Sequence, residues 1–229
     1  MDIYNPYTMM QKIEYSNGTS NHEEHNNNKD YWDILLSDVK NKEEWKDKKA
    51  LDFACGKGRN VTNLLSLADW SRVDGVDLSE ANIYYCKEEY ANQNSEWYVN
   101  SGVDLEALKS EEYDFVMSTI ALQHIPVHEI RRSLMKEILR VMKPGAVFSF
   151  QMAYGPVEKP GGNPAAYYDN TYFARGTNSS WDVRVNDEQQ VQEDLEEIGF
   201  QNVLTEVRDP FSDTQHPNWI YVRCQKPEK

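Results

Sequence analysis

One stretch decides the fold that this chain is expected to adopt: Leu51-Asp52-Phe53-Ala54-Cys55-Gly56-Lys57-Gly58-Arg59-Asn60. Residues 50–54 are mostly apolar and predict a short buried strand, whereas residues 60–68 carry apolar side chains on one helical face. The glycines between them let the backbone turn tightly and approach a ligand without a Cβ in the way. A strand, a glycine turn and a helix in this order predict a nucleoside or anion site.

Strand and helix patterns alternate along the rest of the chain. Apolar runs predict strands at 73–77, 97–99, 113–118, 146–150, 203–207 and 219–223, and helical spacing predicts helices at 79–90, 129–142 and 187–198. Ser79 is expected to cap the first of these helices, and Lys143-Pro144-Gly145 is expected to end the second. Strands that are apolar along their length are typical of a parallel sheet covered on both faces. We therefore expect an α/β fold with a Rossmann-like, seven-stranded, mostly parallel sheet and helices on both faces.

Two segments depart from this alternation. Residues 1–29 are polar and rich in asparagine, which indicates a loop or partial disorder, and residues 30–39 predict an amphipathic helix that extends the domain at its N-terminus. Residues 154–185 are rich in glycine, proline and aromatic side chains and form an insert after the fifth strand. Such a segment indicates a substrate lid, or else a small additional core. We thus expect one domain over residues 30–229.

Composition narrows the classes of partner and compartment. The 229 residues carry a net charge of −14, which disfavours binding to a phosphate backbone, so no nucleic-acid partner is expected. The three cysteines have no metal-ligand spacing, and no metal site is predicted. No apolar stretch is long enough to span a membrane, and no secretory signal pattern is present. A cytoplasmic protein is the resulting expectation.

The glycine turn does not fit the pattern of dinucleotide-binding enzymes. That pattern, G-x-G-x-x-G, needs a third glycine that brings helix and strand close together, and Val61 stands at its place. The stretch instead resembles motif I of the class I S-adenosylmethionine-dependent methyltransferases, particularly small-molecule members. Asp52, Ala54, Gly56 and Gly58 carry the resemblance, with Ala54 in place of the first glycine.

Further segments support the same resemblance in the same order. Residues 113–125, with Ser118 at the strand end, resemble motif IV, and residues 140–146 resemble motif V. The resemblance implies that Asp77 accepts the ribose hydroxyls, with Leu78 beside it. It also implies that Asp104 and Leu105 lie near the adenine. The alternative for the aspartates is structural: a strand end for Asp52, a helix cap for Asp77 and a helix start for Asp104.

His124 and Tyr31 lie where the resemblance puts the mouth of an active site and its cover. His124 is a candidate general base for the acceptor, or else a structural histidine. Tyr31 either covers the methionine end of the cofactor or packs within its helix. Cys55 is expected to fill the turn rather than act as a nucleophile, because no histidine is placed to activate it.

The resemblance implies transfer of a methyl group from S-adenosylmethionine to a small-molecule acceptor, with S-adenosylhomocysteine as the product. The alternatives are a catalytically silent module that keeps the fold for cofactor or partner binding, and a methyltransferase that acts on protein or RNA. A nicotinamide oxidoreductase is disfavoured by the missing third glycine. The sequence does not identify the acceptor, because proteins of one fold vary the residues that bind it.

Overall fold

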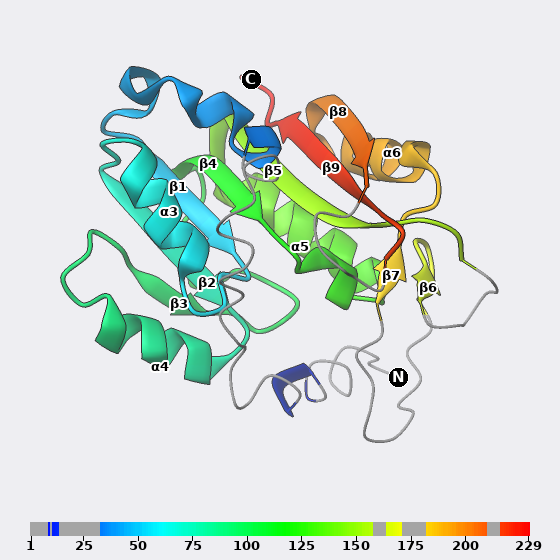
Figure 1. Cartoon of the computed structure of the whole chain (residues 1–229), viewed down its shortest axis with the longest axis horizontal. Coiled ribbons are helices and arrows are strands. Elements are labelled where there is room, and N and C mark those ends of the chain that lie inside the picture. Colours follow the sequence, from blue (N-terminus) through cyan, green and yellow to red (C-terminus); the bar gives the residue numbers. More distant parts are fainter. Residues whose placement is uncertain (1–8, 10, 14–32, 158–163, 171–181, 210–215) are drawn as a thin grey trace.

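A seven-stranded sheet forms the centre of the molecule, seen in a computed structural model that describes residues 9, 11–13, 33–157, 164–170, 182–209 and 216–229 (Figure 1). Its strand order is β3-β2-β1-β4-β5-β9-β8. The strands are β1 (Lys49–Phe53), β2 (Arg72–Asp77), β3 (Trp97–Val99), β4 (Tyr113–Ser118), β5 (Met142–Tyr154), β8 (Gln201–Arg208) and β9 (Asn218–Gln225). Only β9 pairs antiparallel with its neighbours β5 and β8. The predicted seven-stranded, mostly parallel sheet is confirmed.

Helices cover both faces of this sheet. On one face, the 3₁₀ helices η2 (Ser37–Lys40) and η3 (Lys42–Trp45) and the helices α3 (Arg59–Leu67) and α4 (Glu80–Glu89) share one buried cluster. On the other face, α5 (His128–Val141) and α6 (Glu188–Ile198) share a second cluster with the opposite sides of the strands. Two clusters separated by one sheet define a doubly wound α/β fold.

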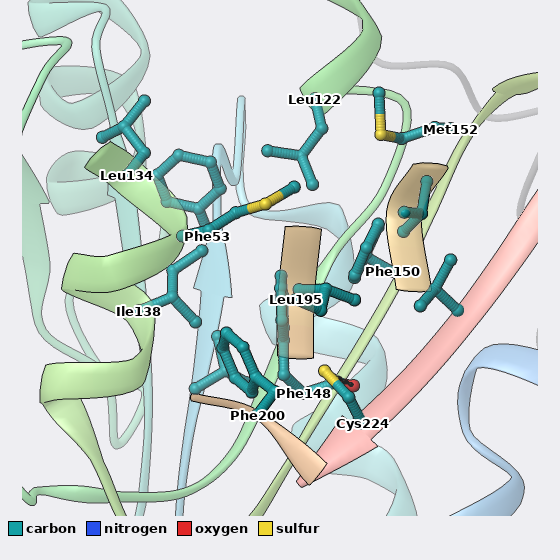
Figure 2. Close-up of a cluster of buried hydrophobic side chains, with 14 of the residues drawn as sticks. Phe53, Leu122, Leu134, Ile138, Phe148, Phe150, Met152, Leu195, Phe200 and Cys224 are labelled. Atoms are coloured by element: carbon teal, nitrogen blue, oxygen red, sulfur yellow. Dashed lines mark hydrogen bonds between the residues drawn. The ribbon is translucent and has the colours of Figure 1, made fainter. Parts of the chain in front are cut away.

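Figure 2 shows the second cluster, in which side chains of α5, α6 and the sheet interdigitate. Leu134 and Ile138 of α5 and Leu195 of α6 are at most 2% exposed. Phe148 and Phe150 of β5 stack beside them with ring centroids 4.7 Å apart. Burial of each such side chain stabilises the fold by about 1.5–3 kcal/mol. Packing of α5 and α6 against β5 supports the pairing of β5 with β4, and the candidate site lies at the ends of these strands.

The helix boundaries follow from local capping. Ser79 caps α4 by accepting a hydrogen bond from the backbone N–H of Asn82 at 3.2 Å, as its position in the sequence predicted. Asp187 caps α6 in the same way through the N–H of Gln189. Gly199 ends α6 with a φ of +117°, a conformation that favours glycine.

The sequence underestimated the length of β5. Residues 143–145 were expected only to end a helix, but they belong to a strand that begins at Met142, directly after α5. The pairing register of β4 with β5 shifts between Met142 and Val147, which accommodates Pro144 and Gly145 as an irregularity of the strand. A proline and a glycine together looked like a turn, whereas here they lie at the start of a long strand.

The N-terminal region contains more helix than its composition indicates. Residues 9 and 11–13 are helical, although a loop or disorder was expected over residues 1–29. The side-chain amide of Gln11 donates a hydrogen bond to the backbone carbonyl of His124 at 3.3 Å. The helix expected over 30–39 is helical at 33–35 and continues as η2. Its first three residues, Tyr31 among them, lie outside the described residues.

The insert after β5 contributes a small two-stranded sheet. β6 (Ala165–Ala166) pairs in parallel with β7 (Val183–Arg184), and Tyr167 directly after β6 is fully buried. The Tyr167 hydroxyl donates to Asp194 of α6, and the Arg131 guanidinium lies 4.6 Å from its ring centre. At Tyr167 the insert is therefore additional core. The aromatic residues 172, 173 and 181, which suggested a lid, lie outside the described residues.

The turn after β1 depends on Gly58 for both conformation and space. Gly58 has a φ of +81°, and a Cβ at this position would come within 2.7 Å of the Trp97 ring and 2.8 Å of the Tyr90 ring. These two rings stack on each other with centroids 5.6 Å apart, so neither can move away freely. The glycine that carries the motif thus also lets β3 and α4 pack beneath the turn.

We predict that Gly58→Ala destabilises the protein by about 3 kcal/mol, from the left-handed backbone and from the clash with Trp97 and Tyr90. Gly145→Ala is the matched control, because Gly145 also has a positive φ, of +76°, but its nearest contact would be an ordinary 3.6 Å. The control is expected to cost about 1–2 kcal/mol. Thermal or urea unfolding measures both variants, and equal losses would contradict the steric role of Trp97 and Tyr90.

Candidate active site

The candidate site lies where β1, β2 and β4 end at the same edge of the sheet. Phe53 pairs with Val76 and with Ser118, so the turns that follow these strands are neighbours. Positive φ angles occur in two of these turns: +59° at Ala54 after β1 and +52° at Ile120 after β4. This conformation is rare for any side chain and most unfavourable for a β-branched one. Strain of this kind is typical of functional sites that the surrounding structure holds in place.

Asp77 at the end of β2 connects the glycine turn after β1 to the segment between β2 and α4. Its Oδ2 accepts the backbone N–H of Gly56 at 2.9 Å, and its Oδ1 accepts the N–H of Ser79 at 2.8 Å and the Asn82 amide at 3.3 Å. Burial raises the pKa of Asp77 from its ordinary value, and the hydrogen bonds from Ser79, Gly56 and Asn82 oppose that shift. Because a carboxylate oxygen can accept two hydrogen bonds, Oδ2 retains capacity for a ligand hydroxyl.

Asp52 near the end of β1 is fully buried. Its Oδ1 accepts a hydrogen bond from Asn60 of α3 at 3.3 Å, while its Oδ2 has no hydrogen-bond partner among the described residues. Burial raises the pKa of Asp52 to about 7, against the opposing effects of Asn60 and Arg59. An ionised carboxylate is unfavourable in a buried position, so this side chain is suited to a bound cationic group.

A comparison within the same sheet makes Asp52 unusual. Asp74 in β2 is equally buried, but both of its oxygens are occupied: Arg72, the Tyr113 hydroxyl and the Glu96 backbone N–H all donate to it at 2.8–3.0 Å. Asp74 is therefore a satisfied structural carboxylate. Asp52 lacks such partners at the strand end, where a ligand of this fold would lie.

Other buried polar groups without partners surround the end of β4. The Ser118 hydroxyl and both side-chain polar atoms of Gln123 and of Gln151 have no hydrogen-bond partner among the described residues, although all three side chains are fully buried. Ser118 pairs with Phe150, so Gln151 stands one residue further along the neighbouring strand. Unsatisfied buried polar groups are rare in native proteins and indicate a place for a ligand or ordered water. Of these residues, the sequence had indicated only Ser118.

The residues expected near the ribose and the adenine differ in their exposure to solvent. Asp104 is partly exposed, and its Oδ1 accepts the backbone N–H of Glu106 at 3.3 Å. The Leu105 side chain lies in the core, with its N–H donated to Glu137 and its carbonyl accepting from Arg140. Leu78, directly after β2, is partly exposed. The contacts of these three residues with a cofactor stay predictions, as does that of Tyr31.

His124 ends the 3₁₀ helix η4 (Leu122–His124) that follows β4, and its side chain is 32% exposed. Its Nδ1 lies 2.6 Å from Oδ1 of Asp182, a residue of the insert. The other oxygen of Asp182 lies 2.9 Å from Nε2 of His216, which precedes β9. The strand-end histidine is therefore connected to two distant segments of the chain.

Cys55 has no features of a nucleophile. It is buried, and burial raises the pKa of its thiol well above the ordinary value, so it is protonated at neutral pH. Its Sγ and that of Cys86 both lie near the carbonyl of Gly56, at 3.6 and 3.5 Å.

Within the described part of the chain, no group of His, Cys, Asp and Glu side chains could hold a metal ion. No helix in that part is long and apolar enough to cross a membrane.

Sequence reasoning missed several residues that build the site. Asn60 bridges Asp52 and Thr119, because its amide also donates to the Thr119 hydroxyl at 2.8 Å. The only available signal was a polar residue on the first turn of α3 at a position that the helical pattern leaves buried. Asp182 and His216 gave no signal, since they lie 58 and 92 residues from His124 in the sequence (182 − 124 and 216 − 124).

The strand order, the glycine turn and the strand-end carboxylates define a class I methyltransferase fold. Consistent with this, residues 51–150 match the family model described as "Methyltransferase domain". Residues 51–150 thus carry a methyltransferase domain, and the chain has the fold of the class I S-adenosylmethionine-dependent methyltransferases. No functionally curated protein matches it in sequence.

Solved structures with this fold come from diverse organisms. An S-adenosylmethionine-dependent methyltransferase of Methanosarcina mazei has a TM-score of 0.64 at 17% identity, and the match covers 82% of this chain and 97% of that one. A Haemonchus contortus phosphoethanolamine N-methyltransferase, solved with phosphomonomethylethanolamine and S-adenosylhomocysteine, has a TM-score of 0.60 at 16% identity, over 85% of this chain and 51% of that one. A match to the complex of a Haloferax volcanii methyltransferase with its activator Trm112 has a TM-score of 0.61 at 14% identity and covers 99% of both chains. At these identities the similarity concerns the fold.

The buried carboxylate of Asp52 gives a pH-dependent prediction. Its pKa is about 7 in the folded protein and 3.8 ordinarily, so from about pH 4 to about pH 7 the folded state holds a proton that the unfolded chain has released. Stability from this group therefore falls as pH rises through that window. Above pH 7 the ionised buried carboxylate costs up to about 4 kcal/mol.

Asp52→Asn should accordingly stabilise the ligand-free protein by about 1–3 kcal/mol at pH 8, because the amide keeps an acceptor for Asn60 and carries no charge. At about pH 4, the low end of that window, the variant and the wild type should have nearly equal stability, which provides the internal control. Urea unfolding at both pH values measures the difference. A loss of stability at pH 8 would show that Asp52 is a satisfied structural carboxylate.

Proposed function

We propose that this protein transfers a methyl group from S-adenosylmethionine to a small-molecule acceptor, with His124 as the general base. The observation that carries the proposal is the buried Oδ2 of Asp52, which has no hydrogen-bond partner among the described residues and lies near a glycine turn fixed by Asp77. The match of residues 51–150 to a methyltransferase domain supports the reaction class, and the strand-end residues have the chemistry that fits the donor.

The charges and donors at the strand ends suit the parts of S-adenosylmethionine. The ammonium of its methionine part would neutralise Asp52, whose pKa is raised chiefly by burial. The ribose hydroxyls would donate to the remaining lone pair of Asp77 Oδ2. Ala54, Gly56 and Gly58 belong to the turn after β1, whose backbone a nucleoside could approach closely because the glycines have no Cβ. Asp104 is the candidate for the adenine amino group.

When bound, S-adenosylmethionine supplies a methyl group on a positively charged sulfur, and its transfer to a hydroxyl leaves a neutral thioether and one proton to be removed. His124 is a titratable side chain that can take that proton, because it is partly exposed in η4, which follows β4, while its Nδ1 is held by Asp182. The protein otherwise contributes by orienting the reactants and excluding water, worth about 7–11 kcal/mol of the barrier in favourable cases.

Two features favour a small acceptor over a macromolecule. The net charge of −14 disfavours RNA, whose phosphates would be repelled. Gln123 and Gln151 are buried polar side chains whose amides could bind a small polar molecule. A macromolecule is too large to reach side chains that are buried in this way. The phosphoethanolamine enzyme with the same fold acts on a small polar compound of this kind.

Cofactor binding is the first test of this function. Titration calorimetry of the full chain should give saturable binding of S-adenosylhomocysteine. Asp77→Ala should weaken it at least tenfold, because both the ribose contact and the anchor of the Gly56 turn are lost. His124→Ala, the control at the acceptor side, should change the affinity less than about twofold. Absence of any saturable binding to the wild type would refute the proposal, and equal losses in the two variants would refute the division of roles.

Turnover is the second test. Release of S-adenosylhomocysteine should be measured across a panel of small hydroxyl, amine and thiol compounds, with RNA and protein extracts as competing acceptor classes. We expect product with at least one small hydroxyl compound. Cofactor binding without product from any class would favour the catalytically silent module, and product from RNA or protein alone would replace the proposed acceptor class.

A further inference from the structure

Asp182 joins His124 and His216 into one continuous arrangement of hydrogen bonds. Nδ1 of His124 lies 2.6 Å from Oδ1 of Asp182, and Nε2 of His216 lies 2.9 Å from Oδ2. Beyond His216, the Nε–H of Arg184 in β7 donates to its Nδ1 at 3.1 Å. Side chains from η4, from the insert and from the segment before β9 thus converge on a single carboxylate.

The donor chemistry of arginine fixes the protons in this arrangement. Arg184 can only donate, so Nδ1 of His216 must be the acceptor and cannot carry a proton. The proton of the neutral His216 ring is then on Nε2, from which it is donated to Asp182. His216 is therefore a directed donor to Asp182, which leaves the other carboxylate oxygen for His124.

Asp182 is an ionised acceptor in this position. Burial would raise its pKa, but the hydrogen bonds from His124 and His216 outweigh burial and hold the pKa well below its usual range. An ionised carboxylate can only accept, so the proton of neutral His124 is on Nδ1. Nε2 of His124 is thereby left as the basic nitrogen of the ring.

The arrangement is rigid at the end away from His124. The His216 side chain is 7% exposed, and its ring contacts the Trp219 ring edge-on with centroids 5.4 Å apart. A terminal nitrogen of Arg184 also donates to the carbonyl of Pro156 at 3.3 Å. Asp182 itself is 15% exposed at its side chain. The orientation of the carboxylate is therefore set by packed residues, whereas the exposed part of the arrangement is the His124 ring.

We propose that Asp182 and His216 are positioning residues, which hold His124 with its proton on Nδ1 so that Nε2 takes a proton from the acceptor. This inference rests on the proposed function of His124. It also names the acceptor class: a hydroxyl compound, whose oxygen must lose a proton as it is methylated. The oxygen bonds to the methyl carbon, the carbon–sulfur electron pair goes to sulfur, and the hydroxyl proton moves to Nε2. The resulting imidazolium is stabilised by Asp182.

A second histidine–aspartate pair in the same protein differs in its surroundings. His128 lies 3.0 Å from Asp194, but this carboxylate also accepts from Arg132 and from the Tyr167 hydroxyl, between α5 and α6. That pair stabilises the contact of α5 and α6 with the insert and involves neither Asp182 nor the two histidines that bond to it. His128→Gln is therefore the matched control, because it removes a histidine bonded to an aspartate without altering the Asp182 arrangement.

The position of the ring proton can be measured on the full chain without any ligand. Long-range ¹H–¹⁵N correlation spectra at about pH 8 distinguish the two neutral forms of each histidine. We expect His124 with its proton on Nδ1 in the wild type and in His128→Gln. In Asp182→Asn the Nε2-protonated form should dominate, since the new amide can donate to Nδ1. His124 protonated on Nε2 in the wild type, or unchanged in Asp182→Asn, would overturn the inference.

His216 is tested by a pair of variants. His216→Gln keeps an N–H that can reach Asp182 and should retain the Nδ1-protonated form of His124. His216→Ala removes the donor and should shift His124 partly to the other form. If both variants leave the spectrum of His124 like that of the wild type, His216 does not act through Asp182.

Kinetics with the hydroxyl compound found in the panel complete the test. Asp182→Asn should lower kcat about a hundredfold, within the range that general-base catalysis contributes, with affinity for S-adenosylhomocysteine within twofold of the wild type. Unchanged kcat together with an unchanged tautomer would refute the positioning role while the methyltransferase function stands. Absence of saturable cofactor binding to the wild type would instead refute the proposed function. The spectra would still test whether Asp182 sets the ring proton of His124.

Discussion

The hydrogen bond from the Gly56 backbone N–H to the Asp77 carboxylate is the interaction on which the site depends. It joins the turn after β1 to the end of β2, and the same carboxylate accepts the backbone N–H of Ser79, the N-cap residue of α4. Beneath the turn, the Trp97 and Tyr90 rings occupy the space that a Cβ on Gly58 would need. The turn is thus fixed by the Asp77 carboxylate at Gly56 and by the Trp97 and Tyr90 rings at Gly58. Such fixation would preorganise the backbone for a ligand.

Around this fixed turn the protein keeps polar groups buried at a cost to its stability. Asp52 has an oxygen without a hydrogen-bond partner in the described part of the chain and a pKa raised by burial to about 7. Asp74 in the next strand is equally buried, but both of its carboxylate oxygens accept hydrogen bonds. The contrast indicates that the sheet can satisfy a buried carboxylate where only structure is required. At Asp52, we propose, the carboxylate is kept for a ligand, a common exchange of stability for function.

The sequence predicted the parts of this molecule that follow from periodicity and from local motifs. All seven strands, the N-cap at Ser79 and the positions of Asp52 and Asp77 at neighbouring strand ends come from patterns within a few residues. The long β5 was missed because Pro144 and Gly145 read locally as a turn, although pairing with β4 and β9 overrides that preference. Asp182 and His216 were missed because no local pattern connects residues that only tertiary folding brings to His124.

The central claim is that the strand ends bind S-adenosylmethionine through Asp52 and Asp77 and present its methyl group towards His124. A crystal structure of the full chain with S-adenosylhomocysteine tests it most directly. The account predicts ribose hydroxyls on the Asp77 carboxylate, the ligand ammonium on Oδ2 of Asp52, and the sulfur facing Nε2 of His124. A ligand bound elsewhere, or one that leaves Oδ2 of Asp52 without a partner, would contradict it.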